Sequence, residues 1–242
     1  MVNVFSFCLY GPENPRYYPG MLENVFLAGK YFPTWKVYVY YAPDVEESML
    51  NTLGACSSVE LRPTGVLGAP NMIHRFYAID EPGVDMMMVR DADSRIHYRD
   101  RWAIREFVKS NFLAHTIRDN EQHTARMMGG LWGIRKSAGI SLREAYASYV
   151  EDMSRGHRVA HDQNFLADVI YPKVLPSLMI HSSIRLRFRD EHVFMIPFEW
   201  SNEIFCGRVE MNFRDIHTPR SQSILQTLPQ ASVRVLDTSF RG

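Results

Sequence analysis

Two aspartates, Asp91 and Asp93, follow closely after a very apolar segment at 84–89. In an open parallel sheet, ligands bind outside the carboxyl ends of the strands. Two carboxylates spaced at i and i+2 directly after such a strand would both lie at that edge of the sheet. Such oxygen ligands suit Mg²⁺ or Mn²⁺, which proteins often hold with one or two carboxylates plus substrate phosphates. The spacing therefore predicts a site where a metal neutralises a diphosphate leaving group and acts as a Lewis acid.

Two arginines, Arg90 and Arg95, flank this pair. Guanidinium groups bind phosphates and carboxylates well, so both are candidates for contacting a phosphate or for holding the carboxylates in place. The alternative for Asp91 and Asp93 is structural: aspartates are common in the turn after a strand, and a single Asp-x-Asp is a weak signal.

The elements that must position these aspartates alternate along the first ninety residues. Strands of buried type alternate there with amphipathic helical segments. This alternation predicts an α/β fold with a doubly wound, mostly parallel central sheet flanked by helices. The expected strands are 2–10, 35–41, 59–62 and 84–89, and the expected helices are 21–27, 45–53 with Asp44 as its cap, and 71–79.

The rest of the chain is less regular. Glycines make 127–134 either a strand or a bent loop, and Pro172 is expected to end the last clear helix. A polar, weakly patterned tail begins near Asp215. The other expected elements are a helix at 100–109, a strand at 112–117, a helix at 141–153 with Ser141 and Glu144 in capping-box spacing, and a helix at 162–170, followed by short strands and loops.

The composition fits one α/β domain, or one domain with a small C-terminal extension. Lys plus Arg and Asp plus Glu each number 27, which argues against a nucleic-acid partner. The three cysteines, Cys8, Cys56 and Cys206, lie far apart and predict neither a zinc site nor a disulfide framework. No apolar stretch is long enough for a membrane span, and the N-terminal segment is typical of a strand rather than a signal peptide. We therefore expect a cytoplasmic protein.

Three segments in order, VRDADSR, MMGGLWGIRK and HDQNFLADVIYP, resemble nucleotide-sugar glycosyltransferases of the GT-A fold with a DxD motif. The resemblance is strongest to the glycogenin and bacterial galactosyltransferase type, and similar short domains occur in glycan-building proteins of large algal viruses. It covers about 2–181. It implies a nucleotide-binding half at 1–95, an acceptor and catalytic half at 96–185, and an extension at 186–242 of unassigned role.

The resemblance also implies a reaction. A hexosyl or deoxyhexosyl group would pass from a nucleoside diphosphate donor, with a UDP-sugar favoured, to a hydroxyl of a glycan or glycoprotein. Asp91 and Asp93 would bind Mn²⁺ or Mg²⁺ and the diphosphate. Gly129 and Gly130 would line the sugar and acceptor pocket, and Trp132 would either stack on a sugar or pack in the core.

The third segment implies catalytic residues. Asp162 would contact donor hydroxyls or act as a base, and Gln163 would lie near the anomeric carbon. Retention of configuration is favoured, because the Asp-Gln pair resembles retaining members more. A purely structural alternative makes Asp162 the N-cap of its helix.

The remaining roles come from position within the resemblance. Tyr10 and Gly11 would contact the base, and Arg75 the nucleotide or diphosphate. The alternative for Arg75 is a salt bridge with Asp80 or Glu81. His181 is the expected third metal ligand, with His217 as its substitute, although the family's usual neighbours of that histidine are missing.

Two other functions compete with this one. A phosphohydrolase of the haloacid-dehalogenase type would use Asp91 as its nucleophile. That motif normally follows the first strand, whereas about ninety residues precede it here. The second alternative is a nucleotide-sugar or glycan-binding module without catalysis.

Overall fold

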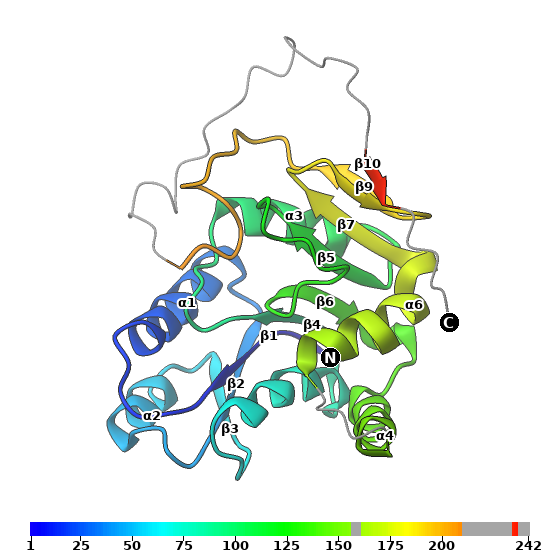
Figure 1. Ribbon diagram of the computed structural model, residues 1–242. Coiled ribbons are helices and arrows are strands. Elements are labelled where there is room, and N and C mark those ends of the chain that lie inside the picture. The colour runs from blue at the N-terminus through cyan, green and yellow to red at the C-terminus, as the bar shows by residue number, and fades with distance from the viewer. Residues whose placement is uncertain (156–160, 210–233, 237–242) are drawn as a thin grey trace.

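The computed structural model describes residues 1–155, 161–209 and 234–236. Its centre is a sheet with the strand order β3-β2-β1-β4-β6-β5-β7-β9, and Figure 1 shows helices packed around it. These strands are β1 (Val2–Leu9), β2 (Lys36–Tyr41), β3 (Val59–Pro63), β4 (Val84–Arg90), β5 (Ala114–Arg118), β6 (Leu131–Arg135), β7 (Leu178–Ser182) and β9 (His192–Met195). A short second sheet pairs β8 (Leu186–Phe188) with β10 (Arg234–Leu236).

All neighbouring strands of the large sheet are parallel except at β6, which runs antiparallel to both β4 and β5. The expected mostly parallel α/β sheet flanked by helices is confirmed. The α-helices are α1 (Tyr17–Tyr31), α2 (Glu47–Gly54), α3 (Tyr98–Lys109), α4 (Leu142–Arg155), α5 (Asp162–Phe165) and α6 (Tyr171–Val174). The 3₁₀ segments are η1 (Ala69–Asp80), η2 (Lys136–Ala138) and η4 (Leu175–Ser177), and η3 (Leu166–Ile170) is a π-helix.

The side chains of β1 explain why its sequence is continuously apolar. Phe5 and Phe7 enter one buried cluster with α1, α2 and α3, whereas Val4 and Cys8 enter a second cluster with η1, α4 and α5 on the other face. A strand covered on both faces needs apolar residues at every position. Burying each large apolar side chain contributes about 1.5–3 kcal/mol, so β1 and its neighbours form a rigid support for the sheet's edge.

Two expected helix boundaries are wrong. Helix α2 begins at Glu47 with Glu46 as N-cap, and Asp44 instead accepts a hydrogen bond from the Gly11 amide at 3.0 Å. Pro172 does not end its helix. The π-helix η3 shifts the hydrogen bonding, so that the Tyr171 N–H donates to the Leu166 carbonyl. Pro172 then falls in the first turn of α6, where its missing N–H is tolerated.

The glycine-bearing segment 127–134 is both a loop and a strand, because β6 begins only at Leu131. Gly133 pairs with Met88 of β4, and a Cβ atom on Gly133 would overlap the Met88 side chain. Glycine in this strand therefore permits the close approach of β6 to β4.

The expected polar tail from Asp215 lies outside the described residues, apart from β10. Within the described residues, no helix has both the length and the apolar character needed to cross a membrane.

Candidate functional site

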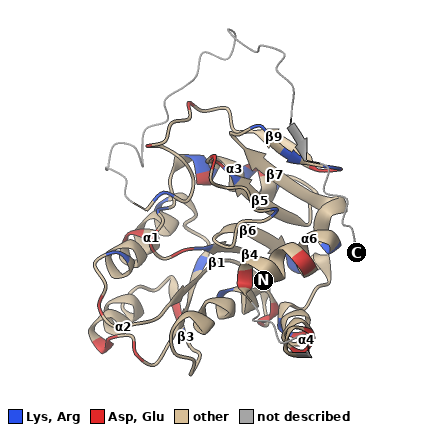
Figure 2. Cartoon of the chain, viewed as in Figure 1, with Lys and Arg blue, Asp and Glu red and all other residues tan. Residues whose placement is uncertain are grey.

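A cavity of about 290 Å³ lies at the carboxyl ends of β1 and β4, where open α/β sheets bind ligands. Figure 2 shows that most charged residues lie on the helices and loops, while the central strands carry few. The cavity is an exception to that apolar centre, because carboxylates and guanidinium groups share its wall. Its lining residues are Cys8, Leu9, Tyr10, Arg16, Tyr17, Met72, Arg75, Asp91, Ala92, Asp93, Gly207 and Val209.

Arg75 joins two of the expected site residues. Its Nη1 donates to Oδ1 of Asp91, and its Nη2 donates to Oδ2 of Asp162 at 3.1 Å. Burial lowers the pKa of the Arg75 guanidinium, but the nearby Asp91 and Asp162 carboxylates outweigh it, so the pKa is raised and the group stays charged. A salt bridge of Arg75 with Asp80 or Glu81 is therefore not formed.

Asp93 is held by a residue that the sequence did not single out. Arg16, immediately before α1, donates from Nε to Oδ2 of Asp93 at 2.5 Å. The Asp93 carboxylate and hydrogen bond raise the pKa of Arg16 against a smaller effect of burial. Because 77 positions separate the two residues, no local motif could reveal the pair.

The backbone between the two aspartates is fixed by helix α1. The buried Asn24 side chain donates to the carbonyls of Ala92 at 3.3 Å and Ser94 at 2.7 Å, and accepts from Ile96 N–H at 2.9 Å. Gly20 allows close contact, since a Cβ atom there would overlap the Ala92 carbonyl. The sequence could have indicated this role of Asn24, because a polar residue stands there among the apolar residues of the buried face of α1.

Arg90 and Arg95 play different structural roles. Arg95 holds the loop, because its Nη1 donates to the Asp93 carbonyl at 2.5 Å and its Nε to Glu23 at 2.7 Å. Arg90 is 1% exposed and lies 3.3 Å from Asp100. A phosphate contact for Arg90 is therefore wrong: its side chain points into the core.

Gly129 and Gly130 lie beside the carboxylates. A Cβ atom on Gly130 would overlap the Asp91 carboxylate, and one on Gly129 would lie 3.4 Å from Gln163 Oε1. Gln163 uses both ends of its amide on this segment, accepting from Gly129 N–H at 3.0 Å and donating to the Met127 carbonyl. The structure thus brings together four expected site residues, which are Asp91, Gly129, Gly130 and Gln163. Among them, Gln163 holds the backbone of the glycine segment in position.

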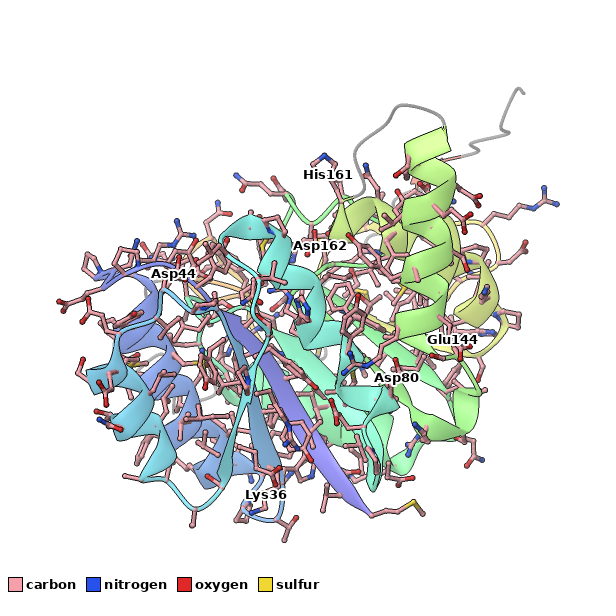
Figure 3. The ribbon with its side chains drawn as sticks, turned by 90° about the horizontal axis from the view of Figure 1, so that it is seen from below. Lys36, Asp44, Asp80, Glu144, His161 and Asp162 are labelled. Carbon is pink, nitrogen blue, oxygen red and sulfur yellow. The ribbon has the colours of Figure 1, made fainter. Side chains whose placement is uncertain are left out.

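Asp162 lies at the edge of the sheet where the parallel strands end. In Figure 3, Asp162 and His161 are at the top, opposite Lys36, which begins β2 at the bottom. The N-cap of α5 is His161, and Asp162 is the first helical residue. The N-cap alternative for Asp162 is therefore wrong by one position, and its Oδ2 is engaged by Arg75.

Tyr10 lines the cavity, whereas Gly11 does not. Gly11 has a positive φ of 84°, and its backbone is anchored by Asp44 and by the Tyr18 hydroxyl at 3.1 Å. Gly11 is thus a turn residue that follows the end of β1. Burial raises the pKa of the Tyr10 phenol, so it is a neutral hydrogen-bonding group at physiological pH.

Trp132 and His181 are not brought to this cavity. Trp132 is fully buried in β6 and meets Phe76 edge-on at 5.1 Å, so the core-packing alternative holds and sugar stacking is wrong. His181 is 1% exposed, and its Nδ1 lies 2.8 Å from His115 Nε2. Its ring packs against Trp102. His181 is therefore no partner of Asp91 and Asp93, and His217 lies outside the described residues.

One group of ligand-type side chains in the described part of the chain lies elsewhere. His97, Asp100 and Cys206 place one ligand atom each within 4.8 Å of one another. His97 and Asp100 form the capping box that begins α3, and Arg90 stands 3.3 Å from Asp100. The Arg90 guanidinium already faces the Asp100 carboxylate, and His97 and Asp100 serve to begin α3.

The residues at the cavity suit a hard divalent cation. Asp91 is 44% exposed and Asp93 lines the same wall. Among the described residues, no side chain donates to Asp91 Oδ2 or Asp93 Oδ1. Carboxylate oxygens of this kind are the ligands that Mg²⁺ and Mn²⁺ take, whereas the thiol of Cys8 is buried and its pKa is raised to about 12.

No protein-family model and no curated protein matches the chain. Solved structures do. A galactosyltransferase, LgtC, in complex with donor and acceptor sugar analogs aligns with a TM-score of 0.52 and 11% identity, over 77% of this chain and 75% of that one. A 4-diphosphocytidyl-2C-methyl-D-erythritol synthase from Anaerococcus prevotii aligns with a TM-score of 0.49 and 8% identity, over 75% and 86%. A mannosyltransferase from Pyrobaculum calidifontis, in complex with GDP-Man and Mn²⁺, aligns with a TM-score of 0.43 and 12% identity, over 57% of this chain and 45% of that one.

At such identities the likeness shows the fold alone. This chain has the Rossmann-like GT-A fold, with a mostly parallel sheet flanked by helices, and the galactosyltransferase aligns with it over that fold.

Proposed function

We propose that this protein is a metal-dependent glycosyltransferase. It would move a sugar from a nucleoside diphosphate donor, with a UDP-sugar favoured, to a hydroxyl of a glycan or glycoprotein. One observation carries the proposal: Asp91 and Asp93, at the end of β4, line a single cavity together with Arg16 and Arg75. Carboxylates beside guanidinium groups at this edge suit a metal-bound diphosphate.

Mn²⁺ or Mg²⁺, held by Asp91 and Asp93, would supply the charge that stabilises the departing diphosphate. Arg75 and Arg16 orient these carboxylates and supply cationic hydrogen-bond donors for phosphate oxygens. Tyr10, at the rim formed by the end of β1, is our candidate for contact with the base.

Asp162 is the proposed group at the sugar. Its Oδ2 is held by Arg75, so the carboxylate has a fixed orientation. In a retaining reaction, which we favour, it would bind donor hydroxyls. In an inverting one it would accept the proton of the attacking hydroxyl. Gln163 contributes by fixing the backbone of Met127 and Gly129 rather than through a free amide.

The test begins with thermal unfolding in the presence of UDP-, GDP- and CDP-sugars, with and without MnCl₂. A donor that binds the folded protein raises the midpoint. We expect one donor to do so only with metal, and Asp91→Asn to abolish the effect, whereas Asp190→Asn, at an exposed position, leaves it intact. Metal-dependent release of nucleoside diphosphate in the presence of acceptor sugars then measures transfer, and product NMR gives the anomeric configuration.

Other results would assign other functions. Phosphate trapped covalently on Asp91 would indicate a phosphohydrolase, and tight donor binding without turnover across many acceptors would indicate a binding module. No stabilisation by any nucleotide, with or without metal, would refute the proposal.

A further inference from the structure

The Arg16–Asp93 ion pair joins two very different environments. The Arg16 side chain is 55% exposed, whereas that of Asp93 is 9% exposed. In the part of the chain that the structure describes, Arg16 is the only side chain paired with the Asp93 carboxylate. A buried carboxylate needs a cationic partner, but an exposed guanidinium is well solvated by water without one. Asp93 therefore depends on Arg16 more than Arg16 depends on Asp93.

Arg75, the other guanidinium of the cavity, is built differently. Its side chain is 7% exposed and holds Asp91 and Asp162 at once. Moving it would leave two carboxylates without their partner, so Arg75 is a fixed part of the site. Arg16 has one carboxylate partner and lies at the mouth, over the ring of Tyr17 at 5.6 Å.

The charges of the cavity wall set a condition on ligands. Two carboxylates of the wall, Asp91 and Asp93, meet the guanidinium groups of Arg16 and Arg75. Asp162 is not part of the wall, but it shares the Arg75 guanidinium with Asp91, so these five groups together carry one negative charge in excess. A diphosphate alone would add to that excess. A divalent cation that takes Asp93 would meet the guanidinium of Arg16 at the same carboxylate, and like charges repel.

We propose that Arg16 is an exchangeable counter-ion, which leaves Asp93 when a divalent cation binds and moves to the diphosphate of the donor. The inference rests on the proposed function, because it assumes that cation and diphosphate share this cavity. Arg16 then weakens the binding of the metal alone, because the metal must displace it from Asp93. It strengthens the binding of metal and nucleotide together, because the displaced guanidinium binds the diphosphate. By exchanging between Asp93 and the diphosphate, Arg16 makes the two ligands bind cooperatively.

The test uses the full-length protein and two matched variants. Arg16→Gln removes the charge at the cavity. Arg143→Gln removes a similar one outside it, since Arg143 is 50% exposed, pairs with Glu81 at 3.0 Å and lies over the ring of Tyr77 at 4.6 Å. Binding of Mn²⁺ is measured from the EPR signal of free Mn²⁺ in titrations with MnCl₂ alone. The binding of UDP and of GDP is then measured in parallel at saturating MnCl₂ by calorimetry.

Opposite changes are expected for the two ligands. Arg16→Gln should bind Mn²⁺ alone about fivefold more tightly, because a competing ion pair is gone, and should bind the nucleoside diphosphate about tenfold more weakly. Arg143→Gln should match the wild type in both. Unchanged Mn²⁺ affinity in Arg16→Gln, or a weakening of it, would overturn the proposal.

Thermal unfolding provides a second readout that does not depend on the nucleotide. In EDTA, Arg16→Gln should unfold at a lower temperature, because Asp93 lacks its partner, and MnCl₂ should raise its midpoint more than that of the wild type. Adding Asp93→Asn to Arg16→Gln should remove this extra gain, and an extra gain that persists would contradict the exchange. If neither wild type nor variants bind Mn²⁺ in a way that Asp91→Asn abolishes, the proposed function itself fails.

Discussion

Gly130 lies directly against the carboxylate of Asp91, so that a Cβ atom at this position would overlap it. The contact follows from strand pairing: Arg90, the last residue of β4, is opposite Leu131, the first residue of β6. The residues on either side of that pair, Asp91 and Gly130, must therefore meet. Glycine at 130 leaves room for a carboxylate that faces the cavity.

The substitution Gly130→Ala tests this contact. The added methyl group would push the Asp91 carboxylate from its position beside Arg75, and we expect Mn²⁺ affinity to fall by about tenfold or more. Gly29→Ala is the matched control: it lies in α1 with no atom near its Cβ position, and should stabilise the protein by about 0.5–1 kcal/mol. EPR titration and urea unfolding measure the two effects. Unaltered Mn²⁺ binding in Gly130→Ala would show that Asp91 does not bind the metal from this position.

Replacing Arg75 tests the bridge between the two halves of the site. Arg75→Met would leave the Asp91 and Asp162 carboxylates without their shared partner, at a position where the guanidinium is almost fully buried. Breaking a fully buried pair destabilises a protein by about 3–5 kcal/mol, and because Asp91 is 44% exposed and Asp162 17% exposed, the loss here should be nearer about 1–3 kcal/mol. We expect a loss of that size in urea unfolding at pH 7. A loss below about 1 kcal/mol would mean that the bridge contributes little to the folded state.

The buried pair His115 and His181 predicts how stability depends on pH. Burial lowers the pKa of His181 to about 4, and burial and the neighbouring His181 lower that of His115 well below its ordinary value. The unfolded chain therefore binds protons below about pH 6.5 that the folded protein does not. The contribution of this pair to the free energy of unfolding should be constant above about pH 6.5 and should decrease as the pH drops towards 4.

At pH 5.5 the expected loss is about 1.4 kcal/mol for each of the two histidines relative to pH 7.5. Urea unfolding at several pH values measures it. The double variant His115→Leu, His181→Leu removes both groups and should flatten the profile by about twice that amount, because replacing both partners by apolar residues leaves no lone polar group. An identical slope in the wild type and the double variant would rule out this pair as its source.

The alternation of apolar strands and helices was enough to predict the sheet and the place of Asp91 and Asp93 after β4. The side chains of Trp132 and His181 were harder to place. Both stand in strands covered on two faces, where all residues except Arg135 at the end of β6 are buried, so the alternation that would tell one face from the other is missing. Their burial follows from neighbours such as Phe76 and Trp102, which are distant in sequence.

The support of the site was predicted least well. Arg16 and Asn24 reach Asp93 and its neighbours across 68 to 77 positions, and their spacing resembles no motif. Arg75 was found only through its position before β4, and its two partners come from separate segments. Contacts of this kind depend on how α1 and η1 pack on the sheet, which local sequence patterns do not determine.

The reversed direction of β6 has a consequence for variation of the cavity. At this edge, every other strand of the sheet is followed by the residues after its C-terminal end. Because β6 is antiparallel, the residues at this edge are those before its N-terminal end. The connection from β5 to β6, residues 119–130, thus returns to this edge and ends at Gly130, which meets the Asp91 carboxylate. Changes in the end of this connection can therefore alter the surroundings of Asp91 while β4, the strand that precedes it, keeps its own sequence.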